Sequence, residues 1–270
     1  MVGLKDIHGN AGTVAQGWRT DTYRALSSSA PDNIHVLTVD YRGYGLSTGS
    51  PSEAGLIADG IAVARWAIDV AKIPPARIVL LGQSLGTAVA TAVAERFIID
   101  DGIEFKGILL IAAFSDIPTL MSTYAIGGVI PILSPLRPYP FLQRLFAKGV
   151  QETWFTAKRL EHLVRKSKNI NLQLIHSKND FDIPWTHSNT LFYAAANATS
   201  KNALTSKLID ATKIHQDLGG SGHRNVWKVL QNDGGQKIVT QDVVHHGVSR
   251  AIFRMFFERD FAQLNDFDEV

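Results

Sequence analysis

The apolar residues of this 270-residue chain occur in short runs that alternate with longer amphipathic segments. Short runs of branched and aliphatic residues are typical of strands buried on both faces, and they occur at 2–7, 33–40, 77–83, 105–114, 171–176 and 237–244. Helical spacing of apolar residues predicts helices over 22–29, 52–73, 87–99, 186–197 and 248–261. This alternation predicts an α/β fold, a mostly parallel sheet with helices on both faces.

Residues 115–165 interrupt this alternation. Five prolines and the pair Gly127-Gly128 accompany an apolar cluster at 124–133. Long irregular insertions between core strands are usually functional, so we interpret the segment as a cap that supplies an apolar acyl pocket. Ordinary coverage of the sheet is the alternative. The chain is therefore predicted to be a single domain over residues 1–270 with a cap insertion at about 115–165.

The composition narrows the function classes. The formal net charge is +2, and lysines and arginines are scattered along the chain, so no nucleic-acid partner is expected. Cysteine is absent, which excludes disulfides and thiolate nucleophiles. No run of about 20 apolar residues predicts a membrane span, and the first residues lack the pattern of a signal peptide. We therefore expect a soluble or peripheral protein, with membrane contact through residues 115–165.

The segment 77–90 predicts a site of nucleophilic catalysis. A buried strand leads into Gly82-Gln83-Ser84-Leu85-Gly86, and a helix follows. So abrupt a turn strains the backbone of its central residue, and glycines two positions away avoid a collision between strand and helix. The turn would present the hydroxyl of Ser84 beside the amide of Leu85 at the helix N-terminus. We predict Ser84 as the nucleophile and the Leu85 amide as an oxyanion donor.

Two glycine-rich turns precede that segment. The first, 8–12, follows the strand at 2–7 and could direct backbone amides toward the nucleophile, so Asn10 is the candidate for the second oxyanion donor. In the second, 40–47, Asp40 and Arg42 are expected to pair with each other in a structural role.

A serine nucleophile needs a base, and the base needs a carboxylate that orients it. An acid is expected at the end of a strand beyond the serine strand. Asp180 lies nearer the end of the strand at 171–176 than Asp182 does and is preferred.

The base should follow the last strand, which makes His246, beside Gly247, the first choice. His223, in a glycine-rich loop, is the main alternative, and His245 is a weaker one. The histidines show no metal-ligand spacing, so neither a metal nor another cofactor is expected.

Four segments together resemble the α/β-hydrolase superfamily, and within it most of all the monoacylglycerol lipase and lysophosphatidylserine lipase branch. They are the turn at 8–12, the turn at 40–47, the Gly-Gln-Ser-Leu-Gly segment at 82–86 and the stretch 176–184. The resemblance implies an α/β-hydrolase fold and hydrolysis of an acyl ester of a monoacylglycerol or lysophospholipid through a serine acyl-enzyme. It assigns Ser84 as nucleophile, Asp180 as acid, and Leu85 and Asn10 as oxyanion amides.

The chain departs from that branch at both ends. Only seven residues precede the turn at 8–12, where members of the branch usually carry a membrane anchor and further strands, so the N-terminus looks truncated. A longer form would be expected at a membrane such as the endoplasmic reticulum. At the other end, His245-His246-Gly247 passes directly into a helix where relatives look as though they carry Gly-Gly-His. A protein depalmitoylating thioesterase and a catalytically silent lipid- or protein-binding protein are the alternative functions.

Overall fold

The computed structural model describes residues 2–7, 13–15, 19–28, 30–123, 125–126, 130–131, 152–180 and 182–245. Ten of its strands are assigned within these ranges: β1 (Val2–Ile7), β2 (Ile34–Thr38), β3 (Ile78–Gln83), β4 (Gly107–Ile111), β5 (Ala125–Ile126), β6 (Ile130–Pro131), β7 (Ile170–Ser177), β8 (Ile214–Asp217), β9 (Gly222–Leu230) and β10 (Gln236–Val244). The helices are α1 (Arg19–Ser27), α2 (Glu53–Arg65), α3 (Leu85–Asp101), α4 (Ile117–Thr123), α6 (Thr156–Lys166), α7 (Thr186–Ala198) and α8 (Ser206–Thr212). A π-helical turn at Trp66–Val70 extends α2, and short 3-10 helices lie at Pro75–Arg77 and Gly219–Ser221.

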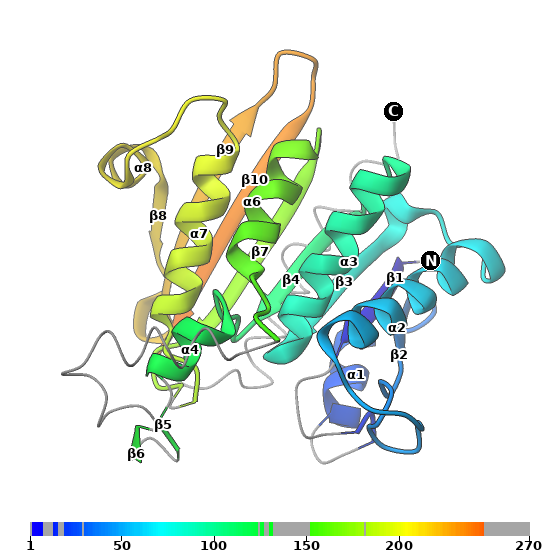
Figure 1. Cartoon of the computed structure of the whole chain (residues 1–270). Coiled ribbons are helices and arrows are strands. Elements are labelled where there is room, and N and C mark those ends of the chain that lie inside the picture. The colour runs from blue at the N-terminus through cyan, green and yellow to red at the C-terminus, as the bar shows by residue number, and fades with distance from the viewer. Residues whose placement is uncertain are drawn as a thin grey trace.

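The central sheet has the strand order β2-β1-β3-β4-β7-β10-β9-β8 (Figure 1). The strands from β2 to β10 in this order are all parallel, whereas β9 pairs antiparallel with β10 and β8 antiparallel with β9. The expected mostly parallel sheet is confirmed. Since the parallel strands share one direction, the residues that follow them gather at one edge of the sheet.

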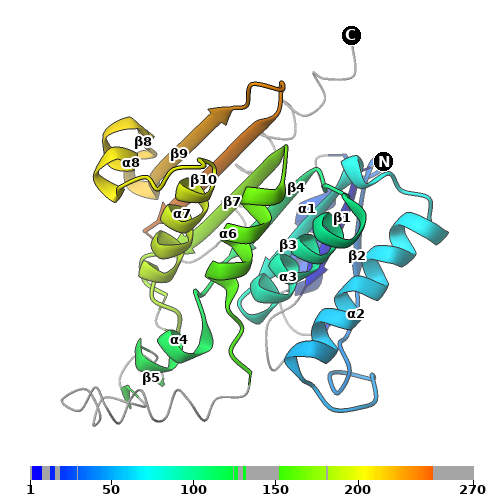
Figure 2. The same cartoon turned by 45° about the horizontal axis from the view of Figure 1, so that its top comes forward.

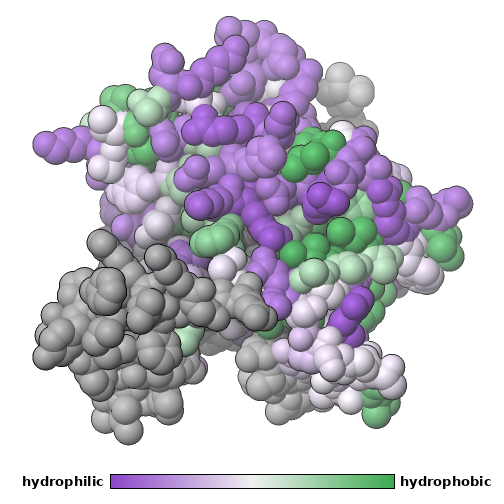
Figure 3. Space-filling model, viewed as in Figure 1, coloured by the Kyte–Doolittle hydropathy of each residue, from purple (hydrophilic) through white to green (hydrophobic). Residues whose placement is uncertain are grey.

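Helices cover both faces of the sheet, as predicted. Helices α2, α3, α6 and α7 lie on one face (Figures 1 and 2), where the larger hydrophobic cluster is buried. On the other face Leu26 of α1 packs with apolar residues from β2, β3, β4 and β7. The outer surface of the layer formed by α2, α3, α6 and α7 is mostly hydrophilic, with apolar patches between the polar side chains (Figure 3).

Helix α3 is the most deeply buried element of that layer. Small residues fill most of its length, and ten of its residues are buried. Small side chains let neighbouring helices and strands approach closely, so α3 packs against β3 on one side and against α2 and α6 on others. A left-handed Gly102 ends the helix, and its amide donates to the carbonyls of Phe97 and Ile98. The helix that begins after Ser84 is thus fixed at the centre of the molecule.

The predicted boundary of the cap is wrong at its C-terminal end. Residues 156–166 form α6, whose Leu160, Leu163 and Val164 are buried in the main core. Helix α6 is the crossover helix between β4 and β7 and packs between α3 and α7. The apolar face of this amphipathic helix packs in the core beside the sheet. The prolines that precede the helix had suggested an irregular segment. The described remainder consists of α4 and the antiparallel pair β5–β6, and most of residues 124–151 lies outside the described residues.

The end of the chain also differs from expectation. The glycine-rich segment that ends at His223, predicted as a loop, contains the end of β8, a 3-10 turn and the start of β9. The polar sequence of β9 hid its strand character, because this strand lies near the edge of the sheet and its side chains are only partly covered. The strand predicted at 237–244 is confirmed as β10. The helix predicted over 248–261 lies outside the described residues.

Candidate active site

Ser84 occupies the turn between β3 and α3. Its backbone has φ 51° and ψ −120°, a conformation that a non-glycine residue adopts only when the surrounding structure enforces it. The Ser84 amide donates to the carbonyl of Ile111 at 3.0 Å, which ties the turn to β4. The residue is partly exposed. The strained turn predicted for the candidate nucleophile is therefore present.

Gly82 makes the close approach of β3 and α3 possible. A Cβ atom on Gly82 would lie 2.7 Å from the carbonyl carbon of Gly86 and 2.8 Å from the Cα of Thr87, and would also overlap the carbonyl oxygen of Gly86. These are backbone atoms, which cannot rotate away as a side chain could. Glycine at position 82 therefore allows the helix to begin directly beside the strand.

Leu85 is the first residue of α3. The first amides of a helix have no carbonyl acceptor within the helix, and the helix dipole places partial positive charge there. The carbonyl of Ser84 accepts the Thr87 amide at 2.9 Å and the Thr87 hydroxyl at 2.6 Å. An oxygen atom that gains negative charge beside Ser84 would meet this helix terminus. The second predicted donor, Asn10, lies outside the described residues.

Asp180 follows β7 and is held by its own loop. Its Oδ1 accepts the amides of Asp182 at 3.0 Å and Ile183 at 2.9 Å, and its own amide donates to the carbonyl of Ser177. The amide of Lys178 donates to the carbonyl of Val244 at 2.7 Å, which anchors the loop to β10. The Asp180 side chain is 21% exposed, and Asp182 is exposed at the surface. The structure therefore favours Asp180 over Asp182 as a precisely held carboxylate.

His176, which the sequence reasoning did not treat as a site residue, lies next to Asp180. It is fully buried in β7, with Nε2 2.7 Å from the carbonyl oxygen of Ile183 and 3.6 Å from Oδ2 of Asp180. Burial lowers its pKa more than the Ile183 carbonyl and the Asp180 charge raise it. The ring is neutral at pH 7, and Nε2 carries the proton because a carbonyl can only accept.

A second buried histidine lies at the start of α7. Nδ1 of His187 is 3.3 Å from the amide of Ser115 and 3.0 Å from its hydroxyl, and the Ser115 hydroxyl is 3.0 Å from Asp116. The backbone amide must donate, so Nδ1 is the acceptor and the proton lies on Nε2. Burial lowers the pKa of His187, and a proton on the neighbouring His176 would lower it further, against the opposite effect of Asp116. This contact fixes the segment that follows β4.

The two predicted bases differ in what the structure describes. His246 lies outside the described residues, and the last described residue, His245, donates its amide to the carbonyl of Ser221 at 3.1 Å. His223 is described and lies in β9, where it pairs with Val243 of β10. Burial lowers the pKa of His223, and the charge of His215 in the neighbouring strand lowers it further.

The position of His223 argues against the alternative base. Four strand spacings separate β9 from β3, the strand that leads to Ser84. At about 4.8 Å for each spacing this is roughly 19 Å, several times the reach of an imidazole. Its strand pairing prevents His223 from folding back across the sheet, which a residue in a loop could do. The glycine-rich sequence around it suggested this histidine, but the antiparallel pairing places it in β9, on the far side of β10 from β3.

The predicted ion pair between Asp40 and Arg42 is wrong. Arg42 instead binds Asp59 of α2, with its Nη2 2.7 Å from Oδ1 and its amide 3.0 Å from Oδ2. Partial burial alone would raise the pKa of Asp59, but the hydrogen bonds and charge of Arg42 outweigh burial and lower it. Asp40 accepts the amide of Val14 at 2.8 Å. The turn at 40–47 is thus held by Asp40 against the segment around Val14 and by Arg42 against α2.

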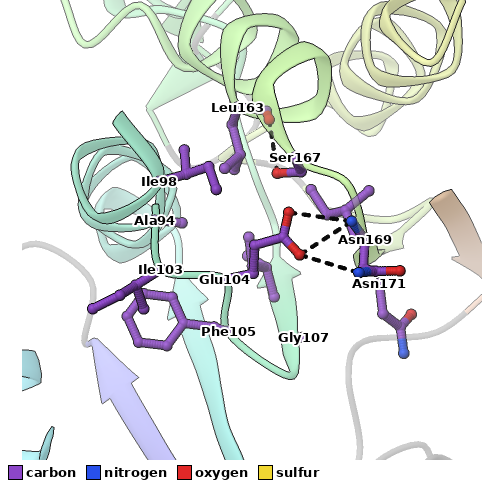
Figure 4. Close-up of a pocket in the computed structure, with 12 residues that line it drawn as sticks. Ala94, Ile98, Ile103, Glu104, Phe105, Gly107, Leu163, Ser167, Asn169 and Asn171 are labelled. Carbon is purple, nitrogen blue, oxygen red and sulfur yellow. Dashed lines mark hydrogen bonds between the residues drawn. The ribbon is translucent and has the colours of Figure 1, made fainter. Parts of the chain in front are cut away.

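The pocket shown in Figure 4 is remote from this edge of the sheet. It is a small, shallow hollow of about 10 Å³ that is partly open to solvent. Gly107 and Ile170, the first residues of β4 and β7, line it, whereas Ser84 and Asp180 follow the last residues of their strands. Glu104 at its rim accepts the amide of Asn169 at 3.1 Å (Figure 4). This hollow is not the substrate site of a nucleophile at Ser84.

The described residues contain neither a candidate membrane-spanning helix nor a candidate metal-binding cluster. No helix within the described ranges is long and apolar enough to cross a bilayer. Over the same part of the chain, no three histidine, cysteine or acidic side chains are grouped in a way that could hold a metal ion.

Residues 7–223 match the model of the alpha/beta hydrolase family. The chain belongs to this family. Among curated proteins, it is 30% identical over 196 residues to the lysophosphatidylserine lipase ABHD12 of Danio rerio, covering 73% of this chain and 48% of the relative. It is 31% identical over 192 residues to protein ABHD12B of Homo sapiens, covering 71% of this chain and 49% of that protein. The chain thus spans about half the length of these relatives.

Solved structures of other proteins have the same fold as this chain. An alpha-beta hydrolase from Vibrio vulnificus aligns with 98% of this chain and 73% of its own, at a TM-score of 0.61 and 18% identity. The esterase Pf2001 of Pyrococcus furiosus aligns with 98% of this chain and 81% of its own, at a TM-score of 0.53 and 18% identity. At such identities the likeness shows the α/β-hydrolase fold alone.

The buried histidines of the hydrolase predict a pH-dependent stability. The folded protein holds His176 and His187 with lowered pKa values, so below about pH 6.5 the unfolded chain binds protons that the folded protein does not. The free energy of unfolding should be constant above pH 7 and fall below pH 6.5, by up to about 1.4 kcal/mol per pH unit for each histidine. Urea unfolding at pH 7.5 and 5.5 measures this, and His187→Gln should reduce the dependence. A midpoint that rises as the pH falls would contradict it.

Proposed function

We propose that this α/β-hydrolase is a serine ester hydrolase that cleaves the acyl ester of a monoacyl lipid, of the monoacylglycerol or lysophospholipid type. The observation that carries the proposal is the position of Ser84. Its strained turn directs a partly exposed serine to the N-terminus of α3, at the sheet edge where the Asp180 loop follows β7. An activated hydroxyl beside a helix terminus and an ordered carboxylate are what acyl transfer requires.

The proposed reaction proceeds in two steps. The Ser84 hydroxyl attacks the ester carbonyl carbon while His246 accepts its proton, and the oxyanion is stabilised by the amides of Leu85 and Asn10. Asp180 orients His246 and stabilises its positive charge. The proton then passes to the departing alcohol as the ester bond breaks. Water attacks the acyl-enzyme in the same way, which releases the fatty acid and restores Ser84.

The lipid substrate is supported by two observations. Residues 115–155, the cap without α6, include an apolar cluster, and the relative from Danio rerio is a lysophosphatidylserine lipase. An apolar cap over the sheet edge would bind the acyl chain and could contact a membrane surface from which the substrate comes. Matched monoacylglycerol, lysophospholipid and acyl-thioester substrates of equal chain length test the head group. Preference for the thioester would favour a depalmitoylating thioesterase instead.

A fluorophosphonate probe tests the reaction class. Wild-type protein should be labelled covalently, and Ser84→Ala should not be labelled. Ser115 is a second serine that lies beside a histidine, since its hydroxyl is hydrogen-bonded to His187. The Ser115→Ala variant should still be labelled. Labelling that persists in Ser84→Ala would refute the assignment of the nucleophile. Absence of labelling in the folded wild-type protein would favour a catalytically silent hydrolase fold that binds a lipid or a protein.

The base is tested by a pair of histidine variants. His246→Ala should lower kcat for a short-chain ester by on the order of a thousandfold or more. His223→Ala should change kcat by less than about threefold, because β9 holds that residue four strands from β3. A large loss in His223→Ala with little change in His246→Ala would reverse the assignment.

A further inference from the structure

The buried imidazole of His176 lies directly behind the loop that carries Asp180. The loop turns back on itself so that Ile183 returns to the end of β7, where its carbonyl oxygen is 2.7 Å from Nε2 of His176. Oδ2 of Asp180 is 3.6 Å from the same nitrogen. The Nε2–H group therefore donates to the carbonyl that closes the loop, and the carboxylate that the loop presents lies close by but beyond hydrogen-bond distance.

The two carboxylate oxygens of Asp180 have different surroundings. Oδ1 accepts two backbone amides, from Asp182 and Ile183. Oδ2 lies 3.6 Å from Nε2 of the fully buried His176, and the Asp180 side chain as a whole is partly exposed. A carboxylate with one oxygen bound by amides can still rotate about its χ angles unless the second oxygen is also held. The second oxygen is not hydrogen-bonded to the imidazole, so the position of the carboxylate depends on the loop, which the contact between His176 and Ile183 closes.

No other polar role is evident for His176 in the described part of the chain. Its side chain is fully buried, and its Nδ1 has no hydrogen-bond partner there. A buried histidine with an unpaired nitrogen is costly relative to an apolar residue of similar size. An apolar residue would continue the pattern of Leu172 and Leu174 on the same face of β7.

We propose that His176 is a positioning residue, whose Nε2–H group holds the Ile183 carbonyl and thereby keeps the loop that presents the Asp180 carboxylate in the geometry that orients the catalytic base. This inference rests on the proposed function of Asp180. The charged or titratable groups that act on His176 are Asp180 from its own loop and His187 from α7, with Asp116 beyond His187. The burial that lowers the pKa of His176 keeps the imidazole neutral, so that it contributes a directed N–H group without a charge.

The test compares two side chains of similar length. In His176→Gln the amide nitrogen can take the place of Nε2 and donate to the Ile183 carbonyl, whereas the thioether of His176→Met cannot donate. The Met variant should lower kcat for a short-chain ester about 10- to 100-fold with KM unchanged, as expected for a misplaced catalytic group. The Gln variant should stay within about threefold of wild type. The same two substitutions at the exposed His162, on α6, serve as matched controls and should leave kcat unchanged.

A pH profile separates positioning from loss of structure. If Asp180 is displaced from the base, the charged form of the base loses stabilisation and its pKa falls. The acid limb of kcat/KM should therefore move to lower pH in His176→Met and remain in place in His176→Gln. Equal kcat and equal profiles in the Gln and Met variants would overturn the inference.

A Met variant that does not fold and a failure of the proposed function are distinguished by further variants. Should the Met variant fail to fold, His176→Asn replaces it, since its amide is one methylene shorter and cannot reach the Ile183 carbonyl; equal activity of Asn and Gln would then overturn the proposal. If Ser84→Ala and Asp180→Asn retain activity, the proposed function fails and this inference with it. If both lose activity while His176→Met retains that of wild type, the inference alone is wrong.

Discussion

Replacing Asp180 by asparagine should lower kcat for ester hydrolysis by about 10⁴-fold. The amide oxygen of asparagine can keep the two hydrogen bonds that Oδ1 accepts from Asp182 and Ile183, so the loop should retain its shape. The substitution removes the negative charge that stabilises a protonated base and favours the wrong tautomer of its imidazole. Steady-state kinetics with a short-chain ester, together with thermal unfolding to check the fold, measure this effect.

Asp182→Asn is the matched control for this prediction. Asp182 is exposed, and its described contact with Asp180 is through the backbone amide, which the substitution keeps. Its kcat should stay within about threefold of wild type. If Asp182→Asn caused the large loss and Asp180→Asn did not, the two aspartates would have to exchange roles.

Replacing Gly82 by alanine should destabilise the fold and abolish activity together. The added Cβ would overlap the backbone of Gly86 and Thr87, so α3 would have to move away from β3. We expect a loss of about 3 kcal/mol in the free energy of unfolding, at the upper end of the range for overpacked sites. Because Ser84 lies between the two elements, its hydroxyl and the helix terminus would shift with them. Urea unfolding and fluorophosphonate labelling measure the two effects.

Gly220→Ala tests whether this result is specific to the turn. A Cβ at Gly220 would meet no atom within 4 Å, so its free energy of unfolding should change by less than about 0.5 kcal/mol. A Gly82→Ala protein as stable and as reactive as Gly220→Ala would mean that β3 and α3 do not need this close approach.

The sequence predicted the parts of the fold that local patterns determine. The buried strands β3 and β4 are almost continuous apolar runs, and helix α3 begins directly after a glycine-flanked serine. Each signal lies within one short segment, so these strands, the mostly parallel sheet and the strained Ser84 turn could be inferred without any long-range contact. The acidic loop after β7 could likewise be predicted from the sequence of one short segment.

Contacts between distant segments could not be inferred in this way. Arg42 could reach Asp40 or Asp59 with similar chemistry, and only the packing of α2 beside the turn selects Asp59. The amphipathic spacing of α6 was hidden behind a proline-rich segment, which moved the predicted cap boundary to residue 165. The role of His176 is also a matter of tertiary structure, because Ile183 returns to it only after the loop has turned.

The sequence by itself determined that this chain has a mostly parallel α/β sheet with a strained serine turn at its centre, since these features follow from apolar runs and from glycines at fixed spacing. The tertiary structure decided which side chains meet at the edge of that sheet. It placed His176 behind Asp180 and confined His223 to β9, four strands from β3. The physical reason is that periodicity fixes the direction of each strand, whereas strand order and loop closure fix the distance between side chains that are far apart in the chain.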